Sequence, residues 1–181
     1  MTDYREKGID KEILDKVEQR AIELENKHHG CAQCTLLAIQ DVCNLKSDTL
    51  TKASSALAGG IGRMRSACGA LSGAALAIGV KYGRGLEDMQ GSSEDSIEKL
   101  HAGNEVVEKL ARWFEREFGS VECRDIRRAY LGTELNPAIP WQKQWISDLK
   151  LSEHCTKVVA KTARRAAALL QNPDLSIVDE V

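Results

Sequence analysis

The stretch KEILDKVEQRAIELEN, residues 11–26, decides the kind of fold that this chain adopts. Its apolar side chains recur at intervals of three and four residues, at Ile13, Leu14, Val17, Ala21 and Leu24. This spacing follows the period of an α-helix with one buried face, while Glu and Lys fill the other positions. The pattern therefore predicts an amphipathic helix that ends before Gly30.

Helical patterns continue along the rest of the chain. We expect helices at residues 31–44, 48–59, 66–80, 97–118 and 152–172, with short helical turns near 121–130 and 141–149. Asp48 and Ser66 are the expected caps of the third and fourth helices, and residues 85–95 are expected to form an exposed loop. Since no strand pattern or linker interrupts this series, we predict a compact all-α domain over residues 1–181, a bundle of about five to seven helices. Residues 1–10 and 174–181 are expected to be loosely held ends.

Composition limits the partners of such a domain. The chain has 181 residues, of which 43% are hydrophobic, so it can bury one core without covalent links. With 25 Lys and Arg against 27 Asp and Glu, no overall field favours nucleic acid or an anionic membrane. The charged N-terminal stretch and the absence of an apolar run of roughly 20 residues lead us to expect a cytoplasmic protein. Short helices with small-residue faces are also compatible with a homodimer.

The six cysteines carry the functional signal. In a reducing compartment, metal binding or redox chemistry is a more common use of cysteine than a structural disulfide. Four of them are expected near helix starts: Cys31, Cys68, Cys123 and Cys155. Backbone N–H groups of a first helical turn lower the pKa of a thiol, and nearby Arg and Lys side chains add to this effect. These four cysteines are the predicted site.

The other two cysteines differ in their setting. Cys34 forms a CxxC pair with Cys31, which places both sulfurs on one helix face, as a reversible disulfide or half of a metal site requires. The chain has no second CxxC and no three-cysteine run of the ferredoxin kind, so a zinc ribbon is not favoured. Cys43 lies late in its helix and is predicted to be a small core residue.

Two segments resemble a known family. GGIGR at 59–63, followed by CGALSG at 68–73, resembles the central signature of the C-GCAxxG-C-C family of redox-active proteins. The segments around Cys31, Cys123 and Cys155 resemble the first, third and fourth cysteine positions of that family in order, whereas Cys34 and Cys43 do not correspond to its positions. The resemblance implies four cysteines acting together in a small helical redox protein, and it makes an iron-sulfur centre an expectation. Residues 64–67, between the glycines and the motif cysteine, are particular to this chain.

The small residues of CGALSG have two readings. Gly69, Ala70 and Gly73 remove bulk beside Cys68, which lets either an inorganic cluster or a neighbouring helix approach the backbone. The residue types alone leave both readings open.

Three functions are compatible with these residues. The leading hypothesis is an electron carrier in which Cys31, Cys68, Cys123 and Cys155 ligate an iron-sulfur cluster, with [2Fe-2S] as the expected type. Such a carrier needs a redox partner protein, which the sequence does not identify. The alternative is a thiol-disulfide oxidoreductase in which Cys31 attacks and Cys34 or Cys68 resolves. A second alternative is a zinc protein that uses some of these sulfurs as structural ligands.

Overall fold

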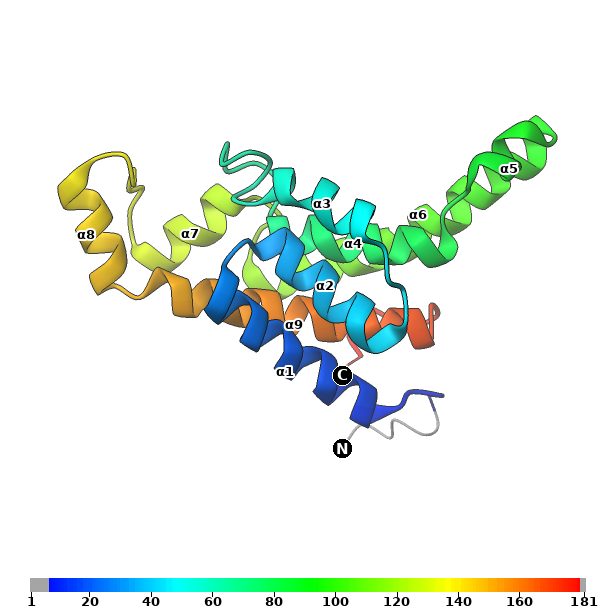
Figure 1. Ribbon diagram of the computed structural model, residues 1–181, viewed down its shortest axis with the longest axis horizontal. Coiled ribbons are helices and arrows are strands. Elements are labelled where there is room, and N and C mark those ends of the chain that lie inside the picture. Colours follow the sequence, from blue (N-terminus) through cyan, green and yellow to red (C-terminus); the bar gives the residue numbers. More distant parts are fainter. Residues whose placement is uncertain (1–6, 180–181) are drawn as a thin grey trace.

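The computed structural model describes residues 7–179, which form nine α-helices, one short 3-10 turn and no strand (Figure 1). The α-helices are α1 (Lys11–His28), α2 (Cys31–Cys43), α3 (Asp48–Ser54), α4 (Gly69–Tyr82), α5 (Leu86–Gln90), α6 (Ser93–Phe118), α7 (Cys123–Leu131), α8 (Pro140–Asp148) and α9 (Leu151–Gln171); the 3-10 turn η1 spans Ser55–Leu57. The predicted all-α class is confirmed. The number of helices is slightly above the expected five to seven.

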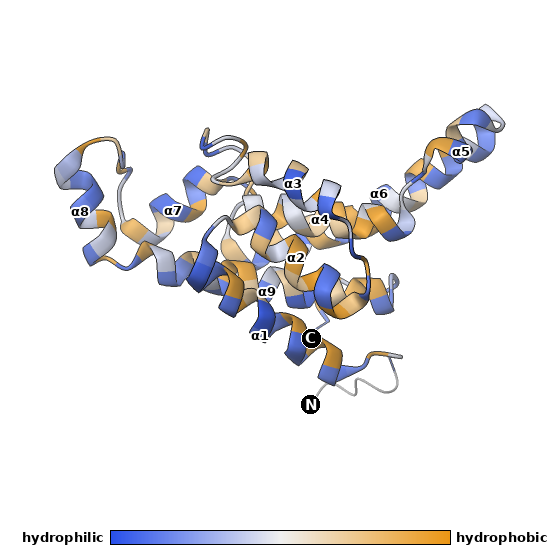
Figure 2. Ribbon diagram, viewed as in Figure 1, coloured by the Kyte–Doolittle hydropathy of each residue, from blue (hydrophilic) through white to orange (hydrophobic). Residues whose placement is uncertain are grey.

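Helices α1, α2, α4 and α9 pack against one another and form the core (Figure 1). Helix α4 is central, since Ala70, Ala74, Ala77 and Ile78 are fully buried. Figure 2 shows α4 in hydrophobic colours, in contrast to the mostly hydrophilic α7. Small side chains on α4 let its neighbours come close, because the distance between packed helices depends on the side chains at the contact. Within residues 7–179, no helix is both long enough and apolar enough to cross a membrane.

The long helix α6 has two differently placed halves. Its C-terminal half packs against α4 and α9 through the buried Val106, Leu110 and Phe114. Its N-terminal half and α5 extend from the body as an arm (Figure 1).

Part of this arm was expected to be a loop, and that expectation for residues 85–95 is wrong. The backbone N–H of Gly85 donates to the Asp88 carboxylate, which also pairs with Lys99 Nζ at 2.8 Å. These contacts stabilise α5, and Ser92 caps α6 by accepting from Asp95 N at 3.2 Å. The short helix α5 forms because Asp88 pairs with Lys99, which lies eleven residues further along the chain.

Two further helix boundaries differ from the expected ones. Helix α4 begins at Gly69 rather than at Ser66. Ser66 cannot start it, because its carbonyl accepts a hydrogen bond from Cys123 N at 2.8 Å and the next residue forms an isolated antiparallel bridge, Ala67 with Glu122. The backbone before the helix is therefore committed to another segment.

Helix α3 is capped by Ser47, whose side chain accepts from Leu50 N at 3.2 Å, rather than by Asp48. It ends at Ser54, and η1 replaces the last turn of the helix expected up to Gly59.

The described parts of the two ends contact the core instead of being loosely held. Ile9 and Leu175 are buried, with 4% and 3% of their surfaces exposed. Arg165, itself fully buried, donates to the carbonyls of Ser176 and Asp179 at 2.6 and 2.8 Å. The buried guanidinium thus fixes the C-terminal segment. Residues 1–6 and 180–181, which belong to the same expectation, lie outside the described residues.

Candidate functional site

The four cysteines of the predicted site lie on four different helices. Cys31 is the first residue of α2, Cys68 is the N-cap of α4, and Cys123 is the first residue of α7. These three positions are the predicted helix starts. Cys155 is not in the first turn, since α9 begins at Leu151.

A backbone pairing brings Cys68 and Cys123 together. Cys68 N donates to Val121 O at 2.8 Å, and Cys123 N donates to Ser66 O at 2.8 Å. The two segments run antiparallel on either side of this pairing. The N-terminus of α7 is therefore held beside the N-terminus of α4.

Cys31 and Cys155 complete the group. A Cβ atom added to Gly69 would lie 2.4 Å from the Cys31 sulfur, so this thiol sits directly on the first residue of α4. Cys155 lies one turn into α9; burial is the main cause of its raised pKa, and the charges of Cys31 and Cys123 raise it further. The structure thus brings the starts of α2, α4 and α7 together with Cys155 nearby on α9, although within residues 7–179 no three His, Cys, Asp or Glu side chains are close enough to hold one metal ion.

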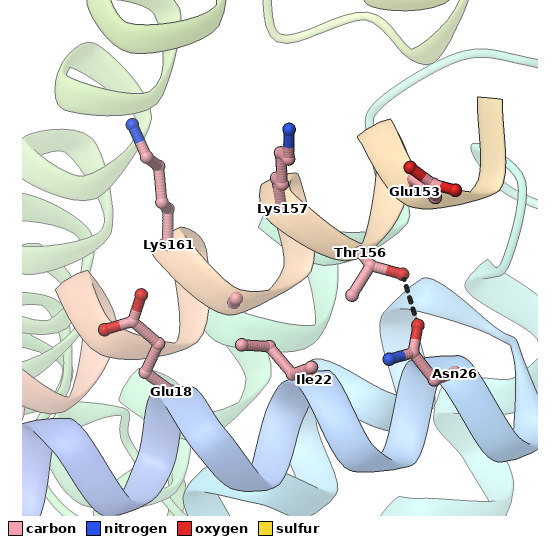
Figure 3. Close-up of a pocket in the computed structure, with 8 residues that line it drawn as sticks. Glu18, Ile22, Asn26, Glu153, Thr156, Lys157 and Lys161 are labelled. Carbon is pink, nitrogen blue, oxygen red and sulfur yellow. Dashed lines mark hydrogen bonds between the residues drawn. The ribbon is translucent and has the colours of Figure 1, made fainter. Parts of the chain in front are cut away.

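Helices α1 and α9 are tied together next to this region. Thr156 Oγ1 donates to Asn26 Oδ1 at 3.1 Å across the groove shown in Figure 3. The groove has a volume of about 300 Å³, and no cysteine lines it. Asn26 follows Glu25, and Thr156 follows Cys155. The hydrogen bond therefore also holds Glu25 and Cys155 in place relative to each other.

The two glycines of the CGALSG motif allow α2 to approach α4. A Cβ on Gly73 would lie 2.2 Å from the Ala32 carbonyl oxygen, and one on Gly69 would collide with the Cys31 sulfur. The space that these glycines leave is occupied by the start of α2. Close helix packing is therefore what the motif provides in this structure, and that packing sets the separation between the starts of α2 and α4.

A left-handed turn precedes the motif and contacts Cys31. Residues 59–63 all have positive φ, between 57° and 73°, and Ile61 and Arg63 are not glycines. Left-handed backbone costs roughly 1–2 kcal/mol for each non-glycine residue. Hydrogen bonds such as Gly62 N to Ala56 O at 2.7 Å hold the turn, and the backbone N–H of Gly59 lowers the pKa of Cys31. The strain is thus stored beside a predicted site residue, which is common at functional sites.

Burial raises the pKa of all four thiols, against our expectation. The pKa of Cys68 and that of Cys155 are each raised to about 12, mainly because burial disfavours the thiolate. Backbone N–H groups of Ala70 and Leu71 lower the pKa of Cys68, as the helix-start argument predicts, but they do not offset desolvation. The expectation of a low thiol pKa is therefore wrong for the protein without a bound group.

Positive side chains reach the same region. The guanidinium groups of Arg127 and Arg65 oppose the effect of burial on the pKa of Cys123, and Arg127 also acts on Cys155. Arg65 and Arg127, which lie close to Cys68 and Cys123 in the sequence, therefore act on the site thiols.

Cys34 is turned toward a buried carboxyl group that sequence reasoning missed. Its sulfur donates to His29 O at 3.4 Å, burial raises its pKa strongly, and the nearby Glu25 carboxyl raises that pKa further. Glu25 is 6% exposed, and within the described chain its Oε2 atom has no hydrogen-bond partner. Burial also raises the Glu25 pKa. A signal existed, since position 25 falls four residues after Ala21 on the apolar stripe of α1.

Cys43 is separate from the site. It is the last residue of α2, about 18 Å along the helix axis from Cys31. It is half-buried and packs against the core, as its prediction as a core residue implies.

A comparison with protein families gives one match. The model of the family described as "Putative redox-active protein (C_GCAxxG_C_C)" matches residues 29–169. This range includes all six cysteines. No curated protein and no solved structure matches the chain.

Proposed function

The chain belongs to the C_GCAxxG_C_C family, which gives it a redox role, and from that premise we propose that it is an electron carrier holding a [2Fe-2S] cluster. Its ligands are the thiolates of Cys31, Cys68, Cys123 and Cys155. The observation that carries the proposal is the gathering of four cysteines from four helices in one largely buried region. Four thiolates are the ligand set of a two-iron cluster.

The surroundings of the sulfurs fit a negatively charged cluster. Backbone N–H groups of Ala32 and Gly59 act on Cys31, and those of Ala70 and Leu71 act on Cys68. N–H groups that donate to ligand sulfurs stabilise the charge of a cluster and tune its potential. When bound, the cluster supplies reversible one-electron transfer. The residues of the chain hold it, partly shield it from water and offset its charge.

The high thiol pKa values also favour ligands over nucleophiles. A thiol that attacks a disulfide must be a thiolate near neutral pH, whereas burial keeps Cys31 and Cys68 protonated. Cys34, the candidate resolving thiol, is engaged with His29 and Glu25. A metal ion provides the positive charge that displaces thiol protons. The thiol-disulfide alternative therefore ranks below the cluster.

Zinc is redox-inert, whereas the family of this chain is described as redox-active. A structural zinc ion requires four ligands around one centre. A two-iron cluster instead spreads its four thiolates over two irons. Zinc therefore ranks third.

Anaerobic purification tests the proposal. We expect a coloured protein with about two iron and two sulfide per chain, which gains an electron-paramagnetic signal on reduction by one electron. Cys123→Ser should lose the colour and most of the iron. A colourless protein that takes up no iron after reconstitution with iron and sulfide would refute the proposal.

Two other cysteines give matched controls. Cys43→Ser removes a thiol from the far end of α2, and Cys34→Ser removes the second thiol of the CxxC pair. Both variants should keep the iron content of the wild type. If Cys34→Ser instead abolishes a reversible change in the number of free thiols, the protein is an oxidoreductase of the alternative class.

A further inference from the structure

A surface cleft lined by arginines adjoins the cysteine site. It has a volume of about 570 Å³ and lies between the left-handed turn, the start of α7 and the connection from α7 to α8. Its polar side chains are Arg63, Arg65, Arg124, Glu134, Asn136 and Gln142. Pockets of this size accommodate small organic molecules.

The free polar groups of this cleft are hydrogen-bond donors. Arg65 pairs with Glu134, with Nη1 and Oε1 3.4 Å apart. Within the described chain, no carboxylate pairs with Arg63 or Arg124, both of which are exposed. The cleft therefore presents two guanidinium groups whose donors are free.

The two amide side chains add donors of the same kind. Asn136 Oδ1 accepts from Ala138 N, and Gln142 Oε1 accepts from Asn136 N. Each amide oxygen thus already accepts one backbone hydrogen bond, while each side-chain NH₂ group remains able to donate. A ligand that satisfies this lining must bring several acceptor oxygens.

The charge of the cleft lining indicates that these acceptor oxygens belong to an anion. Three guanidinium groups line one cleft with a single carboxylate, although the whole chain has a formal net charge of -2. Like charges repel, and a bound anion removes that repulsion while forming charge-assisted hydrogen bonds. Arg63 and Arg65 also keep left-handed backbone, with φ of 68° and 61°, in the turn that carries them to the cleft. The fold thus maintains this arginine cluster at an energetic cost.

The cleft is continuous with the site. Arg124 directly follows Cys123, and its backbone N–H donates to Arg65 O at 3.0 Å. The Arg65 guanidinium is also close enough to lower the Cys123 pKa. A molecule bound between these arginines lies beside one of the four cysteines.

We propose that this cleft binds a small anion with two or more oxygen-rich groups, either carboxylates or phosphates, next to Cys123. Guanidinium groups recognise both through paired N–H···O contacts. The binding of this anion does not rest on the proposed function.

Calorimetric titration of the full chain, purified anaerobically, tests the binding. The probes are citrate for carboxylates and pyrophosphate for phosphates, in about 0.1 M salt to screen long-range attraction. We expect saturable binding of one molecule per chain at millimolar or lower concentration. Arg63→Gln and Arg124→Gln should each weaken it roughly tenfold, the loss of one charge-assisted contact. Binding of citrate alone identifies a carboxylate site, and binding of pyrophosphate alone a phosphate site.

Arg128→Gln is the matched control. Arg128 is exposed on α7 and pairs with Asp125 at 3.1 Å outside the cleft, so the variant makes the same change in net charge. It should bind the probe as the wild type does, and all variants should unfold at the wild-type temperature. Cys68→Ser, which loses the proposed cluster, should also bind. The proposal is overturned if neither probe binds, or if Arg128→Gln weakens binding as much as the cleft variants.

Discussion

Replacing Gly73 with alanine tests the packing that positions the site. The added Cβ would lie 2.2 Å from the Ala32 carbonyl oxygen and 3.0 Å from its carbonyl carbon. Carbon–oxygen contacts in proteins are rarely closer than about 3.3 Å. Because the obstacle is backbone, it cannot rotate away, and α2 must move from α4 by about 1 Å.

The same helix contains the ideal comparison. A Cβ on Gly79 would meet no atom within 4 Å. There the substitution brings only the higher helix propensity of alanine, and Gly79→Ala should stabilise the protein by about 0.5–1 kcal/mol. At Gly73 the same gain is opposed by overpacking, which typically costs about 1–3 kcal/mol. Since a carbonyl is displaced, we expect the upper part of that range and a net loss of about 2 kcal/mol.

Urea unfolding followed by circular dichroism measures both variants. Their free energies of unfolding should differ by about 3 kcal/mol, and their melting temperatures by roughly 6–12 °C for a chain of this size. If Gly73→Ala stabilises the protein as much as Gly79→Ala, then α2 does not approach α4 as described, and the account of the motif is wrong.

Three more predictions follow from the site. Gly69→Ala places a methyl group 2.4 Å from the Cys31 sulfur, so iron and sulfide analysis should find less of both than in Gly79→Ala; equal content would contradict this. Burial raises the Glu25 pKa above 4.5, so as the pH rises above 4.5 the folded state keeps a proton that the unfolded state releases, and the free energy of unfolding should fall. Urea unfolding at several pH values should show a smaller fall for Glu25→Gln. An equal fall in the wild type and the variant would argue against a raised pKa. In the reduced, iron-free protein Cys68, with a pKa of about 12, should react with iodoacetamide at pH 8 far more slowly than an ordinary thiol. Peptide mass spectrometry measures both rates, and equal rates would contradict the raised pKa of Cys68.

Sequence alone was sufficient for the elements whose structure depends on local pattern. The stripe from Leu14 to Leu24 predicted α1, and the cysteine positions predicted three of the four helix starts in the site. Sequence alone was not sufficient where a contact between distant residues determines the structure. The helix α5 depends on the Asp88–Lys99 pair, and the start of α4 depends on the bridge to Glu122.

The chemistry of the site shows the same division. Helix starts do supply N–H groups to Cys68, as predicted, but the direction of its pKa shift is set by burial. Burial results from the packing of four helices and leaves no trace near position 68. Glu25 was missed because its type suggested a surface residue, although its position on the helix suggested the interior.

The bridge between Ala67 and Glu122 also has a consequence for biosynthesis. It joins segments that leave the ribosome far apart in time, and the last cysteine, at position 155, follows later still. No early fragment contains the whole group, because each of the four thiols comes from a different helix. A group held by all four thiols could therefore be inserted only after residue 155 has been synthesised, and shorter nascent chains carry an incomplete set of these thiols.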